Sequence, residues 1–271
     1  MNQLARGAAV LAACTGLLVT ALSPATAAPA LPEQDQAIQQ DHAMGSQIRK
    51  HERGSRLPVK PKPDPAVLAT VAGIDVSGYQ GNVDWASHWN GGKRFAYVKA
   101  TESTGYVNPY FAQQYNGSYD VGMVRGAYHF ALPDRSSGAA QADYFLGHGG
   151  GWSGDGMTLP GALDMEYNPY GSTCYGLSKA SMTSWVLSFS DTYYARTGVY
   201  PVIYTSTSWW NQCVSAGFST TNPLWVARYA SAVGALPFDW DTYTFWQYSS
   251  SPIDQNQFNG GLDRLQALVD G

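Results

Sequence analysis

Residues 159–171 read LPGALDMEYNPYG, an apolar run that carries two acids, Asp164 and Glu166, at its end. A short apolar run bounded by Pro and Gly is typical of a buried strand, and buried strands rarely contain carboxylates. Residues i and i+2 of a strand point to the same face, about 6–7 Å apart along the backbone. We therefore expect both acids on one face at the end of a buried strand.

Six other short apolar segments, each bounded by Gly, Pro or Ser, predict further strands. They lie at residues 71–81, 94–104, 123–133, 199–208, 223–231 and 243–251. Helical patterns separate the earlier strands, and the longest begins at the N-cap Ser178 and stops at Gly198. About eight strands alternating with helices over roughly 200 residues predict an α/β fold. We expect a single irregular (β/α) barrel, with helices over its first five strands and hairpin-like connections over the last three.

The first 70 residues differ from the rest of the chain. Arg6, the apolar residues 7–22 and the small residues 25–27 predict a signal peptide at residues 1–27. A lipoprotein signal ending at Cys14 is the alternative, but the apolar run continues past it. Residues 28–70 are polar and then Pro-rich, which indicates an extension or a pro-segment. The barrel domain is expected at residues 71–271, secreted and free of the membrane once the leader is removed.

The composition favours a neutral polar ligand. Charged residues make up only 13% of the chain, whereas there are 9 Trp and 18 Tyr. The net charge of -4 gives no basic surface for nucleic acid. A glycan fits this composition, although secreted proteins in general often carry few charges.

Two cysteines remain after the leader, Cys174 and Cys213. In an oxidising compartment they are expected to pair as a disulfide, and two free buried thiols are the alternative. No metal site is predicted, because the sequence has no C-x-x-C motif and no nearby His pair.

Acids also occur at other predicted strand ends. In a (β/α) barrel the chemistry lies where the strands end, and Asp75 ends the first predicted strand while Asp254 follows the seventh. Carboxylates that converge in a partly dry site raise at least one pKa. A protonated acid beside ionised ones is what glycoside cleavage requires. Strand-end capping and a Ca²⁺ site are the alternative explanations.

Seven motifs occur in a fixed order: GIDVSGYQG (73–81), YVKATES (97–103), GAYHFA (126–131), ALDMEY (162–167), PVIYTS (201–206), LWVARY (224–229) and FWQYSSS (245–251). Together they resemble the glycoside hydrolase family 25 lysozymes, the Chalaropsis-type muramidases, over residues 71–271. The resemblance implies an irregular barrel of five helices and eight strands. It also implies cleavage, without cofactor, of the β-1,4 bond between N-acetylmuramic acid and N-acetylglucosamine in peptidoglycan.

The resemblance implies a role for each acid. Glu166 matches the general acid, and Asp164 would orient the substrate 2-acetamido group or stabilise the cation. Asp75 would support the site electrostatically. Asp254 matches a fourth acid more loosely, with Asp263 as the alternative. Direct nucleophilic attack, inversion and attack by the substrate's own acetamido oxygen all remain open, and we favour the last.

Five further residues near strand ends are candidates for substrate binding. Aromatic rings could stack on a sugar, and an amide or ammonium group could meet its hydroxyls or the muramyl lactate, but such residues also fill barrel cores. The candidates are Tyr128, Tyr204, Trp246, Gln247 and Lys99. His129 is expected on the opposite face from Tyr128, in a structural role.

The sequence leaves two other functions open. One is a catalytically silent wall-binding module on the same scaffold, which the D-x-E pair disfavours. The other is a chitinase-like hydrolase, although the longer D-x-x-D-x-D-x-E pattern is absent. The expected partner is peptidoglycan, and the expected state is a monomer.

Overall fold

The computed structural model describes residues 41–52 and 70–271. The predicted leader at residues 1–27 lies outside the described residues, as does most of the predicted extension. Among the described helices, none combines the length and apolar character that a bilayer span requires.

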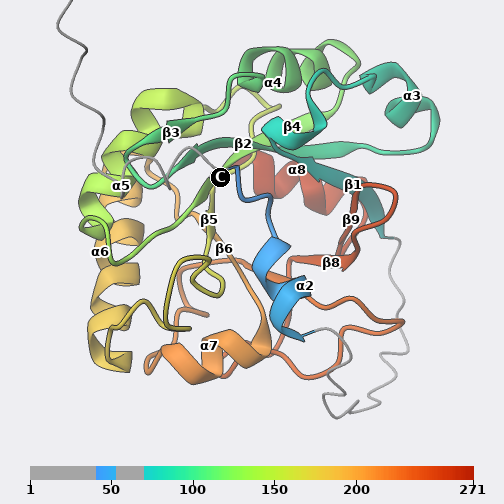
Figure 1. Cartoon of the computed structure of the whole chain (residues 1–271). Helices are drawn as coiled ribbons and strands as arrows, with labels where there is room; N and C mark the ends of the chain where they lie inside the picture. Colours follow the sequence, from blue (N-terminus) through green and yellow to red (C-terminus); the bar gives the residue numbers. More distant parts are fainter. Residues whose placement is uncertain (1–40, 53–69) are drawn as a thin grey trace, which may run out of the picture.

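Eight strands close into a barrel, which confirms the predicted fold class (Figure 1). They are β1 (Val71–Val76), β2 (Phe95–Glu102), β4 (Val124–Phe130), β5 (Ala162–Asp164), β6 (Val202–Thr205), β7 (Leu224–Ala227), β8 (Phe245–Ser249) and β9 (Asp254–Phe258). All neighbours from β1 round to β8 pair in parallel. Strand β9 is antiparallel to both β8 and β1 and so closes the ring. The short β3 (Tyr106–Val107) folds back on β2.

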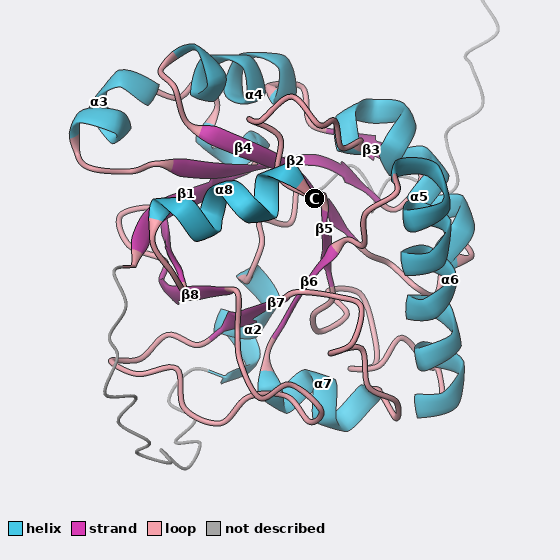
Figure 2. Ribbon diagram, turned by 180° about the vertical axis from the view of Figure 1, so that it is seen from behind, coloured by secondary structure: helices cyan, strands magenta, loops and turns pink. Residues whose placement is uncertain are grey.

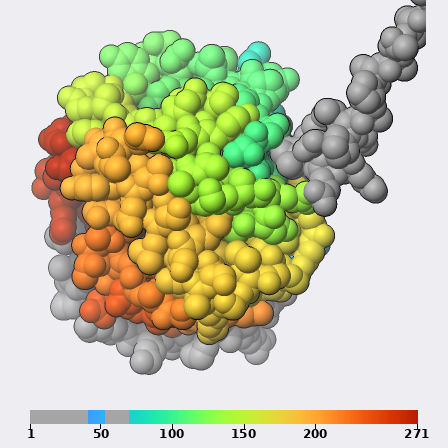
Figure 3. Space-filling view, turned by 90° about the vertical axis from the view of Figure 1, so that its left-hand side faces the viewer, coloured from blue at the N-terminus to red at the C-terminus, as the bar shows by residue number. Residues whose placement is uncertain are grey.

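Helices surround the barrel. They are α3 (Trp85–Asn90), α4 (Phe111–Asp120), α5 (Gly138–Phe145), α6 (Lys179–Thr197), α7 (Thr207–Cys213) and α8 (Leu262–Asp270), with short helical turns η1 (Gly78–Gln80) and η2 (Leu146–Gly150). The described part of the barrel thus has slightly more helices than the five that the resemblance implied. Helices α5 and α6 form one outer face (Figure 3).

The longest helix, α6, begins and ends where the sequence indicates. The Ser178 side chain accepts a hydrogen bond from the Ser181 N–H at 3.1 Å. Gly198 ends the helix in the left-handed conformation, with φ 81°. Both signals are therefore confirmed.

The connections near the C-terminus are irregular, as expected, but not all are hairpins. Strands β8 and β9 form an antiparallel pair, which fits the prediction. Strands β7 and β8 are parallel, so the prediction of a hairpin between them is wrong. A parallel pair requires the chain to return across the barrel, and residues 228–244 do so without a helix.

Aromatic rings fill the barrel interior. The Tyr97 and Trp225 rings lie 4.7 Å apart between centroids, and Phe245 packs against Phe95 at 5.1 Å. Gly73 allows this packing, because a Cβ there would lie 2.5 Å from the Phe95 ring. We call the end of the barrel at the carboxyl ends of the parallel strands the barrel mouth. The aromatic layer forms an apolar floor beneath it.

Cys174 and Cys213 form the predicted disulfide, with their Cα atoms 5.4 Å apart. The bond ties the loop that precedes α6 to the end of α7, on the outside of the barrel.

One described segment precedes the barrel. This N-terminal segment (residues 41–52) contains the helix α2 (Ser46–Glu52). Helices α2 and α8 lie at opposite ends of the barrel, α2 toward the viewer in Figure 1 and α8 toward the viewer in Figure 2. The segment therefore lies at the barrel mouth.

Candidate active site

Four acids converge at the barrel mouth. Asp75 is near the end of β1, Asp164 ends β5, Glu166 lies two residues beyond it, and Asp254 begins β9. All four side chains are buried. The structure thus brings together the four acids singled out in the sequence. The alternative Asp263 lies exposed in the first turn of α8, away from them.

Asp164 is the most isolated of the four acids. It is fully buried, and neither carboxylate oxygen has a hydrogen-bond partner in the described part of the chain. Burial, and next the neighbouring Glu166, raise the pKa of Asp164 well above its ordinary value. Asp164 therefore resists ionisation, and both of its oxygens are free to hydrogen-bond a ligand.

Glu166 is fully buried but richly hydrogen-bonded. Its Oε1 accepts from the Gly45 N–H at 2.9 Å, and its Oε2 accepts from the Gln47 and Ile48 N–H groups at 2.8 Å each. Burial raises the pKa of Glu166 to about 7, although these three donors and Arg49 favour the ionised form. Glu166 thus titrates near neutral pH, as a general acid must.

Asp75 and Asp254 form the other half of the site. Asp75 Oδ2 accepts from Gln247 Nε2 at 2.8 Å and from Asn256 Nδ2 at 2.7 Å. Burial raises the pKa of Asp75 to about 6 against these two donors. Asp254 pairs with Arg49 at 2.8 Å, yet burial and then Asp75 raise its pKa to about 8.

Four of the five substrate-binding candidates surround these acids. Tyr204 donates to Gln247 Oε1 at 2.7 Å, so both reach Asp75 through one chain of hydrogen bonds. The Tyr128 hydroxyl accepts from the Met44 N–H at 3.1 Å. These contacts place their polar ends at the mouth.

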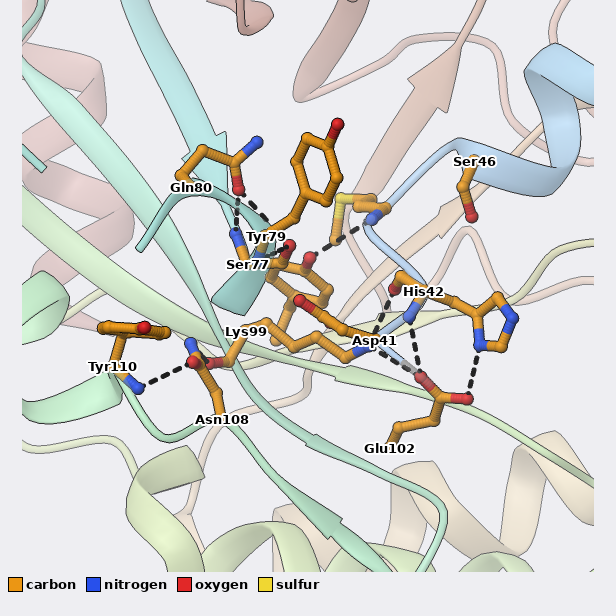
Figure 4. A network of polar contacts seen from close by, with 12 residues as sticks. Asp41, His42, Ser46, Ser77, Tyr79, Gln80, Lys99, Glu102, Asn108 and Tyr110 are labelled. Atoms are coloured by element: carbon orange, nitrogen blue, oxygen red, sulfur yellow. Dashed lines mark hydrogen bonds and ion pairs between the residues drawn. The ribbon is translucent and has the colours of Figure 1, made fainter. Parts of the chain in front are cut away.

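Lys99 is the fourth candidate at the mouth, and it is fully buried. Its Nζ contacts Glu102 at 2.7 Å, Asp41 at 2.9 Å and the His42 carbonyl oxygen at 2.7 Å (Figure 4). Burial alone would lower the pKa of Lys99, but Glu102 and Asp41 outweigh it and raise the pKa. Lys99 therefore remains a cation beside the acids.

The structure does not bring Trp246 into this group. Its neighbour Gln247 points to Asp75, so strand alternation directs Trp246 to the other face of β8. There its Nε1 donates to the Arg228 carbonyl at 2.8 Å. His129 likewise lies outside the group and hydrogen-bonds Thr101 and Gln141, the structural position expected for it.

Several residues at the mouth escaped the sequence analysis. Glu102 lies three residues after Lys99, a spacing that an ion pair could have suggested. Asn256 and Tyr229 were not singled out as site residues, although Tyr229 ends the motif LWVARY, and the segment at residues 41–52 was treated only as part of an extension. Within residues 41–52 and 70–271, no group of three or more His, Cys, Asp or Glu side chains could hold a metal ion.

In a buried cluster of acids with different pKa values, one acid can donate a proton to a neutral ligand while another is ionised. The pKa of Glu166 is about 7, that of Asp75 is about 6, and that of Asp164 is raised well above its ordinary value. Groups whose environments push their pKa values apart in this way are typical of glycosidases.

Known proteins resemble this chain. The model of the family "Glycosyl hydrolases family 25" matches residues 74–257. Lysozyme M1 of Streptomyces globisporus is 44% identical over 264 residues, covering 93% of this chain and 90% of its own length. The N,O-diacetylmuramidase of a Chalaropsis species is 50% identical over 211 residues, covering 74% of this chain and 100% of its own.

Solved structures agree with these sequence matches. The muramidase from Acremonium alcalophilum is 54% identical and superposes with a TM-score of 0.73, covering 74% of this chain and 99% of its own. The match therefore extends from sequence to fold.

Proposed function

Because this chain belongs to glycosyl hydrolases family 25, we propose that it is an exported muramidase. Its substrate would be bacterial peptidoglycan, cut at the β-1,4 bond between N-acetylmuramic acid and N-acetylglucosamine. The observation that carries the proposal is the pair Asp164 and Glu166, buried together at the barrel mouth with raised pKa values. The names of the relatives, lysozyme and N,O-diacetylmuramidase, support the same substrate.

Glu166 is the proposed general acid. It gives its proton to the glycosidic oxygen as the bond from that oxygen to C1 of the muramyl residue breaks. The carbonyl oxygen of the substrate's own acetamido group bonds to C1 and stabilises the developing cation. Asp164 accepts the acetamido N–H, a role supported by its unused oxygens.

Water completes the reaction. The Glu166 carboxylate takes a proton from a water molecule, the water oxygen bonds to C1, and the acetamido group is released. Glu166 then carries a proton again for the next cycle. The ionised Asp75, held by Gln247 and Asn256, stabilises positive charge near C1 in both steps.

Mass spectrometry of digested walls tests the bond that is cut. A muramidase leaves N-acetylmuramic acid at each new reducing end, whereas N-acetylglucosamine there would refute the proposal. NMR of the first product tests the mechanism, because acetamido attack retains the β configuration and inversion gives the α anomer.

The same walls separate the two alternatives. A silent wall-binding module would sediment with the walls without clearing the suspension. A chitinase-like enzyme would cleave chitin oligomers in preference to peptidoglycan. Sequencing the N-terminus of protein recovered from the culture medium tests export, with cleavage after Ala27 expected.

A further inference from the structure

We propose that the N-terminal segment (residues 41–52) is an autoinhibitory pro-segment that fills the substrate site and must leave before peptidoglycan can bind. The inference rests on the proposed function, since it names the regulation of the same site. The segment contacts the proposed general acid, a second acid of the cluster and two of the four substrate-binding candidates at the mouth.

The segment occupies the proposed general acid. Both oxygens of Glu166 are taken by the backbone N–H groups of Gly45, Gln47 and Ile48, at 2.8–2.9 Å. Three donors on one carboxylate favour its ionised form. Glu166 is thus covered by the segment, and neither of its oxygens is open to a glycosidic oxygen.

The segment also occupies the sugar-binding groups on the β2 side. Lys99 is neutralised by Asp41 and Glu102, and His42 contacts Glu102 at 2.8 Å (Figure 4). Met44 is fully buried, and its N–H donates a hydrogen bond to the Tyr128 hydroxyl. A glycan would have to displace all of these contacts.

Contacts on the opposite side fix the segment across the mouth. Arg49 pairs with Asp254 at 2.8 Å. The Glu52 carboxylate accepts from Tyr167 at 3.0 Å and from the Ser206 hydroxyl. The segment therefore spans from β2 to β6 and β9, with an anchor at each end.

Gly45 lies at the tightest point. Its φ is +75°, and a Cβ there would lie 2.6 Å from both Gln247 Oε1 and Tyr204 Oη and closer still to Tyr229 Oη. Only a residue without a side chain lets the backbone come so close to these groups. Such a fit is more specific than the chance collapse of a tail onto a cleft.

The family match does not require the segment. The family model begins at residue 74, after the segment. The Chalaropsis muramidase matches along its whole length yet covers 74% of this chain, so about a quarter of this chain has no counterpart in it. Lysozyme M1 of Streptomyces globisporus matches 93% of this chain, so most of this quarter has a counterpart there and none in the Chalaropsis sequence.

The test uses the chain from residue 28 to 271, with a recognition sequence for a site-specific protease placed between Glu52 and Thr70. Clearing of a bacterial wall suspension is measured before cutting, and after cutting and gel filtration. A tethered segment binds at an effective concentration near millimolar, so we expect the uncut chain to be at least ~10-fold slower. An uncut chain as fast as the cut one would overturn the inference.

Two matched variants locate the effect. Gly45→Ala forces a Cβ against Tyr229, so the uncut variant should approach the rate of the cut chain. Lys50→Ala is the control, because Lys50 belongs to the same segment but is exposed, and its substitution should leave the uncut chain slow. Equal rates for the two uncut variants would contradict the seating of Gly45 described above.

Sedimentation with insoluble walls separates this inference from the proposed function. If neither form clears the walls, the muramidase proposal fails. Binding of the cut and uncut chains to the walls still tests whether the segment blocks the site. We expect the cut chain to sediment with the walls and the uncut chain to stay in solution. Equal sedimentation of both forms would overturn autoinhibition.

Discussion

Asp75 on β1 and Asp254 on β9 are direct partners in the antiparallel ladder that closes the barrel. Their side chains share one face, and each raises the electrostatic cost of ionising the other. Asp75 is stabilised by two amide donors and Asp254 by Arg49 of the N-terminal segment. When the segment leaves, Asp254 loses its cation.

This pairing predicts that Asp75→Asn makes the fold more stable and the enzyme less active. The pKa of Asp75 is raised in the folded chain to about 6 from 3.8, so its ionisation destabilises the fold. The contribution of Asp75 to the free energy of unfolding is therefore fully present below about pH 4 and is lost as the pH rises through about 6. Between pH 4 and 8 the free energy of unfolding of the variant should gain up to roughly 3 kcal/mol on the parent.

Urea unfolding of both uncut chains at several pH values measures this gain. Asp164 and Asp254, whose pKa values the Asp75 charge raises, ionise more easily in the variant, so they add to its gain as the pH rises. Wall clearing by the cut variant should fall roughly 10- to 100-fold, because the charge near C1 is lost. A stability difference that does not change with pH would contradict the raised pKa.

Glu166→Gln tests the general acid. Glutamine keeps the size of the side chain but has no proton of the required acidity. Wall clearing by the cut variant should fall at least about 100-fold. The thermal midpoint of the cut variant serves as the control for folding, and near-normal clearing by a folded variant would remove Glu166 from this role.

The sequence predicts the barrel well from β1 to β8 and its closing strand poorly. The strands from β1 to β8 are apolar runs because both of their faces are covered. Strand β9 reads DQNQF, and its buried face consists of Asp254, Asn256 and Phe258. Since two of these side chains line a polar site, hydrophobic periodicity does not identify the strand.

The same limit applies to the site. Asp164 and Glu166 stand out because carboxylates are unexpected in an apolar run. The segment at residues 41–52 carries no such signal, because it binds Glu166 through backbone N–H groups that every sequence possesses. Its role depends on where the chain folds back, which local patterns do not encode.

The disulfide is predicted to stabilise the domain without serving the chemistry. Cys174 and Cys213 are 39 residues apart, in the loop after β5 and at the end of α7. Closing a loop of that length stabilises by about 4 kcal/mol in the chain-entropy model. The double variant Cys174→Ser, Cys213→Ser should therefore melt about 8–16 °C lower.

Calorimetry of the parent and the double variant measures that shift, and wall clearing at about 20 °C is the companion readout. Clearing should stay within about twofold, since neither cysteine contacts the acids. An unchanged melting temperature would mean that other contacts hold the loop of Cys174 against the end of α7 without the disulfide.

His129 should make the fold sensitive to mild acid. Its ring is fully buried between Thr101 and Gln141, with Phe145 and Phe189 against it, and burial lowers its pKa to about 4. The unfolded imidazole takes a proton below about pH 6.5, whereas the folded one does not until about pH 4. Stability is therefore present above pH 6.5 and is lost as the pH falls, by up to roughly 3 kcal/mol.

The matched comparison is His129→Gln, which keeps a hydrogen-bonding side chain but cannot titrate. The variant should be less stable than the parent at pH 7, because the ring packing is lost. The gap should narrow by up to roughly 3 kcal/mol between pH 7 and pH 4, since only the parent loses the His129 contribution. Lys99 and Glu102, the charged groups nearest the ring, are common to both chains. Urea unfolding curves that stay parallel over this range would show that His129 is already charged, or already exposed, in the folded protein.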